Sequence, residues 1–158
     1  MTWIQIIDDD HWCGEAIIAF MIDQVPEARY ETKTTPEPDD GRDIYIVDNE
    51  FEDGDHGVEI IRTIRRRNPD ATIVMCTATR DRVNAQEAMN AGCNAMVEKG
   101  SARGREQMRE VIRRHIESRC IAVEGPVWRS VLADVKSIIN AWNTRMTQED
   151  AKAVGFAG

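Results

Sequence analysis

The chain has 158 residues, of which 42% are hydrophobic and 30% charged, and its formal net charge is −8. This length and composition fit one soluble globular domain with some residues to spare. The negative charge disfavours sequence-independent binding to nucleic acid phosphates, and no segment approaches the roughly 20 apolar residues that span a membrane. The four cysteines show no paired metal-ligand spacing, so we expect buried thiols in a reducing cytoplasm.

Apolar runs bounded by turn residues predict five strands that alternate with amphipathic helices. The predicted strands cover residues 3–7, 29–34, 43–47, 72–76 and 95–98. The predicted helices cover residues 13–23, 58–67, 81–91 and 103–119, and the first turns Ala16, Ile17, Phe20 and Met21 inward. Residues 35–41 carry two prolines and a glycine, so they predict a loop. This alternation is typical of a parallel sheet covered by helices on both faces.

A further amphipathic helix is predicted over residues 127–146. Its apolar residues recur at spacings of 3 and 4, which fits a short coiled-coil seam in a homodimer or packing against the chain's own domain. The predicted organisation is therefore a domain over residues 1–120, a linker and amphipathic helix over 121–147, and a disordered tail over 148–158.

Five polar residues stand at the ends of four predicted strands. Asp8 and Asp9 follow the first strand, Asp48 follows the third, Thr77 follows the fourth, and Lys99 follows the fifth. Because the carboxyl ends of parallel strands meet at one edge of the sheet, these side chains are expected to share a crevice. Three carboxylates, a hydroxyl and an ammonium group together suit a divalent cation and a phosphoryl group.

The carboxylates predict a magnesium site, because Mg²⁺ prefers oxygen ligands. Asp9 and Asp48 are expected to bind the ion directly and Asp8 through water, with the backbone carbonyl of Glu50 as a further ligand. Asp48 is the candidate phosphoacceptor, because a carboxylate can attack phosphorus to form an aspartyl phosphate. Lys99 would then balance the phosphoryl charge and Thr77 would donate a hydrogen bond to a phosphoryl oxygen.

Several segments carry a resemblance to a known family. They are Ile6–Asp10, Asp43–Asp48, Thr77–Ala78, and Ala91–Ala95 leading to Lys99. Over residues 1 to about 120 the chain resembles a response-regulator receiver domain. The resemblance implies a flavodoxin-like five-stranded parallel sheet of strand order 2-1-3-4-5. It also implies phosphorylation of Asp48 by a histidine kinase or phosphotransfer protein, with Mg²⁺.

The chain departs from the usual receiver pattern at three places. Met96 stands where receivers usually carry the Tyr or Phe that reports phosphorylation, so it is the expected switch position. Gly100 follows the lysine in place of the usual proline, so we expect a trans peptide bond there. The segment from Pro36 to Arg42 is too short and too rich in proline for the second helix, so we expect one face of the sheet to be thinly covered.

Three functions remain open from the sequence. The first is a phosphorylatable receiver that is not an enzyme beyond assisting its own phosphorylation and dephosphorylation, and that signals by contact with a downstream protein. The second is a pseudo-receiver, an interaction module that phosphorylation does not switch, which Met96 and Gly100 motivate. The third is a haloacid-dehalogenase-type phosphatase, because Asp8, Asp10, Thr77 and Lys99 follow that order; it leaves Asp48 without a role.

Overall fold

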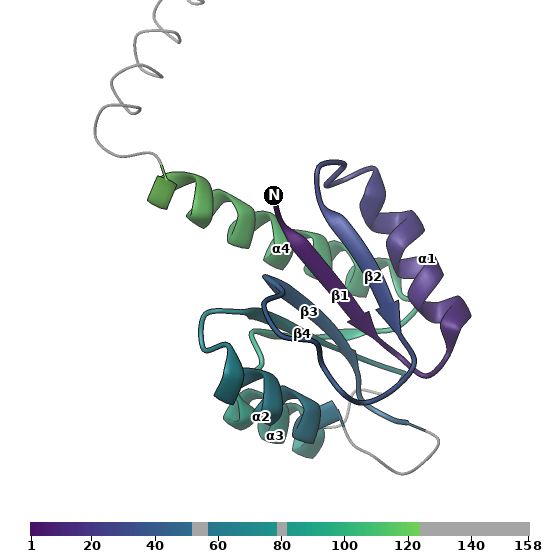
Figure 1. Ribbon diagram of the computed structural model, residues 1–158. Helices are drawn as coiled ribbons and strands as arrows, with labels where there is room; N and C mark the ends of the chain where they lie inside the picture. Colours follow the sequence, from purple (N-terminus) through teal and green to yellow (C-terminus); the bar gives the residue numbers. More distant parts are fainter. Residues whose placement is uncertain (52–56, 79–81, 124–158) are drawn as a thin grey trace, which may run out of the picture. The chain divides into compact units, whose positions relative to one another are not determined.

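The computed structural model of the chain describes residues 1–51, 57–78 and 82–123 (Figure 1). A five-stranded parallel sheet has the order β2-β1-β3-β4-β5, which confirms the predicted fold. The strands are β1 (Trp3–Ile7), β2 (Arg29–Lys33), β3 (Ile44–Asp48), β4 (Thr72–Thr77) and β5 (Ala95–Glu98). By its internal contacts the chain divides into two units, Met1–Ile116 and Glu117–Gly158, and the sheet belongs to the first.

Helices cover both faces of the sheet (Figure 1). In the described part of the chain they are α1 (His11–Ile22), α2 (Gly57–Arg67), α3 (Arg82–Ala91) and α4 (Ala102–Val123). The predicted helix over residues 127–146 and the tail lie outside the described residues. None of the described helices is long and apolar enough to cross a membrane.

Two apolar cores form, one on each face of the sheet. On one face, side chains of α2 and α3 pack on strand residues that include Ile7, Tyr45, Val47, Ile73 and Met75. On the other face, side chains of α1 and α4 pack on strand residues that include Ile4, Ile6, Ile44, Ile46 and Val74. The central strands are therefore buried on both faces, which explains why they read as continuous apolar runs.

Helix α1 differs from its prediction at both its start and its inner face. It begins at His11, two residues before the predicted start, because the Asp10 carboxylate accepts a hydrogen bond of 2.9 Å from Trp12 N and caps the helix. Gly14 is buried against the Thr32 side chain, whereas Ala16, which was expected to face inward, is exposed. Helix α4 also continues past its predicted end to Val123.

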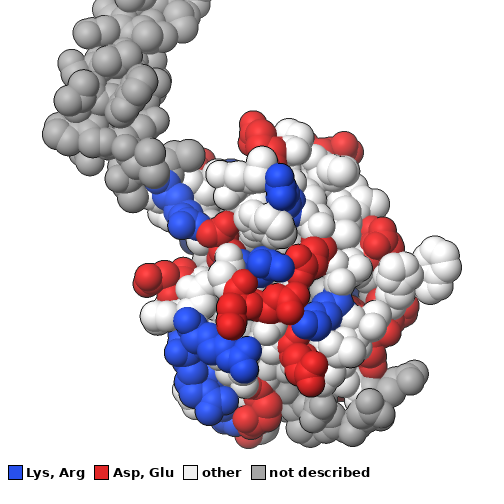
Figure 2. All heavy atoms as spheres, viewed as in Figure 1, with Lys and Arg blue, Asp and Glu red and all other residues white. Residues whose placement is uncertain are grey.

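Residues 34–43, all of which the structure describes, form no helix between β2 and β3. This confirms the predicted loss of the second helix. The face that we expect to be thinly covered is covered by this segment, which we call the 34–43 loop, and by polar side chains of β1 and β2. Figure 2 shows acidic and basic side chains side by side on this side of the molecule.

Gln5 anchors the 34–43 loop to the sheet from a fully buried position in β1. Its amide nitrogen donates to Glu31 Oε1 at 2.5 Å and to Asp39 Oδ2 at 2.7 Å, and its carbonyl oxygen accepts from Asp39 N at 3.0 Å. Asp39 also pairs with Lys33 at 2.7 Å, and this bond above all lowers the Asp39 pKa to about 2. All three hydrogen bonds of the Gln5 amide group therefore go to the neighbouring strand β2 and to the 34–43 loop.

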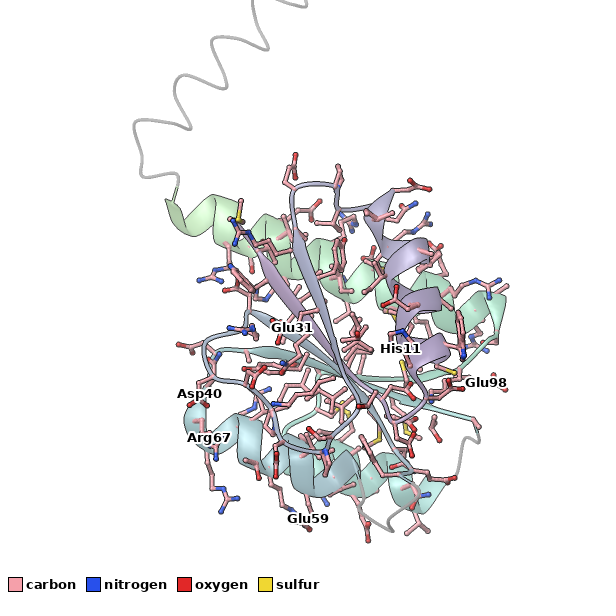
Figure 3. All side chains as sticks on the ribbon, turned by 45° about the vertical axis from the view of Figure 1, so that its right-hand side comes forward. His11, Glu31, Asp40, Glu59, Arg67 and Glu98 are labelled. Carbon is pink, nitrogen blue, oxygen red and sulfur yellow. The ribbon has the colours of Figure 1, made fainter. Side chains whose placement is uncertain are left out.

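The other end of the loop is attached to α2 and β3. The Tyr45 hydroxyl donates to Asp39 O at 2.6 Å, and Asn68 Nδ2 donates to Arg42 O at 2.8 Å. Arg67 pairs with Asp40 at 3.4 Å, and Figure 3 shows these two labelled residues close together. The loop is therefore held from the sheet beneath it and from the helix beside it.

Candidate functional site

The structure brings three of the predicted site residues into direct contact at the carboxyl edge of the sheet. Lys99 Nζ lies 2.8 Å from Asp8 Oδ2 and 2.9 Å from Asp48 Oδ1. Asp8 and Asp48 are 3% and 6% exposed, so both carboxylates are buried. In Figure 3, His11 at the start of α1 and Glu98 at the end of β5 lie toward this same side of the molecule.

Backbone hydrogen bonds between neighbouring strands fix the chain at each of these positions. Asp8 N donates to Lys33 O at 3.0 Å, and Lys99 N donates to Thr77 O at 2.8 Å. Asn49 N, directly after Asp48, donates to Cys76 O at 2.9 Å. The parallel ladder thus continues to the residues that carry the chemistry, and the rigid sheet sets their spacing.

Asp8, Asp9 and Asp48 form a cluster that suits a hard cation. One carboxylate oxygen from each lies within 4.8 Å of the others, with Asp9 half-buried. Oxygen ligands at this spacing fit Mg²⁺, which also keeps bound waters. Glu50 follows two residues after Asp48 with an exposed side chain, and the role of its backbone carbonyl as a ligand stays a prediction.

The electrostatics of the cluster are unbalanced. Burial raises the pKa of Asp48 above its ordinary value of 3.8, although its hydrogen bond with Lys99 acts in the opposite direction. Burial alone would lower the pKa of Lys99, but the hydrogen bonds to Asp8 and Asp48 outweigh it and raise that pKa. Lys99 therefore stays an ammonium group, and its two carboxylate partners lie in a cluster of three acids. A bound divalent cation would relieve the repulsion among these acids.

Thr77 and Met96 lie on the two strands at the other side of Asp48. Thr77 ends β4 and is 1% exposed, and it stands beside Glu98 of β5 in the parallel register. Met96 is half-buried and packs against the core on the α2 and α3 face. The structure thus places Thr77 at the same strand-end edge as Asp48 and the predicted switch residue Met96 against the core; their roles stay predictions.

The sequence singles out Asp10 only as the second acid of the haloacid-dehalogenase pattern, and its role as the cap of α1 was missed. Its backbone N donates to Asp8 Oδ1 at 3.1 Å, and its own side chain accepts from Cys13 Sγ at 3.2 Å and from Trp12 N. These bonds, that of Cys13 first, lower the Asp10 pKa. The signal was available, because an aspartate directly before an apolar helix is a typical N-cap. Asp10 is also the second acid of the haloacid-dehalogenase pattern, and here its carboxylate serves as the cap of α1.

Comparison with known proteins bears on the identity of this fold and site. The model of the response regulator receiver domain family matches residues 4–113. Comparison with curated proteins finds no match.

Similar solved structures include three receiver domains. The BeF3-activated receiver domain of DrrB, an OmpR/PhoB homolog from Thermotoga maritima, is 22% identical with a TM-score of 0.61, over 74% of this chain and 98% of that chain. A CheY-like receiver from Methanospirillum hungatei JF-1 is 18% identical (TM-score 0.63, 74% and 95% covered). A receiver from Clostridium thermocellum is 19% identical (TM-score 0.64, 77% and 99% covered).

These likenesses show the same fold. The family match covers well over half of the chain and includes both Asp8 and Asp48. The chain therefore belongs to the response regulator receiver domain family of two-component signalling.

Proposed function

We propose that the chain is a working phosphoacceptor in which Asp48 receives a phosphoryl group from a histidine kinase or phosphotransfer protein. The observation that carries the proposal is the Lys99 ammonium bridging Asp8 and Asp48, with Asp9 in the same cluster. These residues combine a buried nucleophile, a fixed cation and a set of metal ligands. Phosphoryl transfer needs little more, because it is catalysed mainly by positioning and charge stabilisation.

In the proposed reaction, an Asp48 carboxylate oxygen forms a bond to phosphorus while the bond from phosphorus to the donor histidine nitrogen breaks. The imidazole leaves with the bonding electron pair. Mg²⁺ held by Asp8, Asp9 and Asp48 would neutralise phosphoryl oxygens when it is bound. Lys99 would pair with a phosphoryl oxygen as its contact with the Asp48 oxygen is replaced, and the Thr77 hydroxyl would donate to another.

The first test is phosphorylation of the full-length chain with acetyl phosphate and Mg²⁺, followed by intact-protein mass spectrometry. We expect one phosphoryl adduct in the wild type, and none in Asp48→Asn, because the amide lacks the nucleophilic oxygen charge. Asp40→Asn is the matched control, since this acid is exposed and lies in the 34–43 loop; it should be modified like the wild type. A wild type without any adduct would contradict the proposal.

A pseudo-receiver is the second candidate, and Met96 and Gly100 are the observations that favour it. Met96 offers flexible apolar packing in place of an aromatic ring, so the site could be filled without a response at the surface. Amide chemical shifts measured with and without phosphorylation separate the two. We expect changes that extend from Asp48 to the residues around Met96, whereas changes confined to the strand ends would support the pseudo-receiver.

We further propose that the chain acts in the cytoplasm and signals through a downstream protein instead of through nucleic acid or membrane. The net charge of −8 supports this choice. A homodimer through residues 127–146 and packing of that segment on its own domain stay alternatives. Light scattering of the full chain against a chain that ends at Val123 would separate them, since only the homodimer predicts a lower oligomeric state after truncation.

A further inference from the structure

Hydrogen bonds around the turn between β5 and α4 hold the backbone that leads into Lys99. On the N-terminal side, the Ser101 hydroxyl donates to Glu98 O at 3.3 Å, and Lys99 N donates to Thr77 O at 2.8 Å. The same Ser101 oxygen accepts from Gly104 N at 2.9 Å and so caps α4. The peptide that leads into Lys99 is therefore tied to the first turn of the following helix.

In that first turn, Gly104 lies against the backbone carbonyl group of Glu98. A Cβ atom added at Gly104 would overlap Glu98 O and would lie 2.9 Å from Ser101 Oγ. Both Gly104 and the Glu98 oxygen belong to the backbone, so neither can move aside as the end of a flexible side chain could. Gly100 completes the turn with a φ of +72°, a conformation that glycine adopts without strain. Two glycines thus shape the segment in which other receivers carry a proline.

The same arrangement occurs on the other side of the ion pair. Gly57 begins α2, and a Cβ atom added there would overlap the backbone carbonyl oxygen of Asp48. Gly57 N also donates to Asn49 O at 3.0 Å. The carbonyl of Glu98, directly before Lys99, therefore contacts Gly104 of α4, and the carbonyl of Asp48 contacts Gly57 of α2.

We propose that Gly104 is a positioning residue for Lys99: its missing side chain lets α4 rest on the Glu98 carbonyl and sets where the ammonium group meets Asp48. This inference rests on the proposed phosphoacceptor function and adds to it. Any side chain at position 104 must push the Glu98 to Lys99 peptide away from α4. Because the ammonium group is placed by that peptide, its distance to the phosphoryl group changes with it.

The test is a double-mutant cycle on the full-length chain, measuring the rate of phosphorylation by acetyl phosphate at saturating Mg²⁺. Gly104→Ala should slow the reaction about tenfold or more, because a displacement of about 1 Å can cost up to a hundredfold. In a Lys99→Ala background the same glycine substitution should change the rate less than about twofold, since coupled residues are not additive. Mg²⁺ affinity should not weaken, because Asp8, Asp9 and Asp48 keep their places.

Gly14→Ala is the matched control, since Gly14 is also a buried helical glycine. Its added Cβ would lie 2.9 Å from a methyl group of the Thr32 side chain instead of overlapping a backbone oxygen, so its rate should stay within about twofold of the wild type. Ser101→Ala serves if Gly104→Ala does not fold: it removes the hydroxyl bond to Glu98 O and should slow the reaction through Lys99 in the same cycle.

The possible outcomes separate this inference from the proposed function. A wild type without any adduct contradicts the proposed function, and the inference falls with it. A modified wild type with an equally fast Gly104→Ala overturns the positioning role alone. So does a loss that persists unchanged in the Lys99→Ala background, because the glycine then acts through something other than Lys99.

Discussion

At the scale of residues, the described part of the site gathers three carboxylates around one ammonium group. Lys99 contacts two of the carboxylates, and Asp9 adds a third. Burying charges that are incompletely paired costs stability. The raised pKa of Asp48 is the signature of that cost, because burial disfavours its ionised form. The site without metal is therefore a place where function opposes stability.

Asp48→Asn should accordingly stabilise the metal-free fold at neutral pH. The Asp48 pKa in the folded chain lies above its ordinary value of 3.8, so its favourable contribution is present below that value and is lost as the pH rises through the folded pKa. We expect the variant to show a higher urea midpoint than the wild type at pH 7 in EDTA. The difference should shrink as the pH falls through the folded pKa, because the wild-type carboxyl then becomes neutral as well. A lower midpoint at pH 7 would contradict this account.

The placement of the site residues was predictable because strand ends meet at one edge in a parallel sheet. Asp8, Asp48 and Lys99 each follow an apolar run, so their order along the chain was enough to bring them together. The first turns of the helices were not predictable in this way. Gly57 reads as a loop residue before a helix and Gly104 as an ordinary helix-start residue, and only coordinates reveal that each lies against a backbone carbonyl near the site.

At the scale of elements, the 34–43 loop performs the covering role of a helix by polar contacts instead of apolar ones. The absence of the helix was predictable from Pro36 and Pro38, but the replacement was not. Gln5 reads as a polar interruption in an apolar strand, and its partners Glu31 and Asp39 lie 26 and 34 residues away. No local pattern links residues so far apart. The face of the sheet that we expect to be thinly covered is therefore covered by polar residues that hydrogen bonds hold in place.

Gln5→Ala should unfold more easily than the wild type by about 2 kcal/mol, because it leaves buried polar groups without partners. Asp39 N and the carboxylates of Glu31 and Asp39 all lose a bond to the Gln5 amide. The free energy of unfolding in urea measures this loss. Arg67→Ala is the control for the same loop, since its exposed ion pair with Asp40 should be worth less than about 1 kcal/mol. Equal effects would show that Gln5 does not hold the loop.

At the scale of the whole molecule, metal binding and folding are linked through the sheet. The carboxylates of the cluster come from the ends of β1 and β3, which are neighbours in the centre of the sheet. Unfolding separates them by forty residues of chain, so an ion that needs all three carboxylates would bind the folded state and not the unfolded state. A ligand that binds only the folded state raises its stability by mass action.

Mg²⁺ should therefore raise the free energy of unfolding by about 1.4 kcal/mol at a concentration tenfold above its dissociation constant. Urea titrations at increasing Mg²⁺ measure the effect. Asp9→Asn removes a half-buried ligand and should need more Mg²⁺ for the same gain, whereas Glu37→Gln, an exposed acid on the 34–43 loop, should respond like the wild type. A Mg²⁺ effect that is equal in all three proteins would place the ion elsewhere.

The capping of α1 by Asp10 has an optical consequence. Asp8 Oδ1 accepts from Asp10 N, and the Asp10 carboxylate accepts from the backbone N of Trp12, so the backbone of Trp12 is two hydrogen bonds from the carboxylate cluster. Trp12 is 79% exposed, so its emission responds to a change of charge nearby. Comparison of the fluorescence of the wild type with that of Trp12→Phe therefore offers a way to follow occupancy of the site without a label.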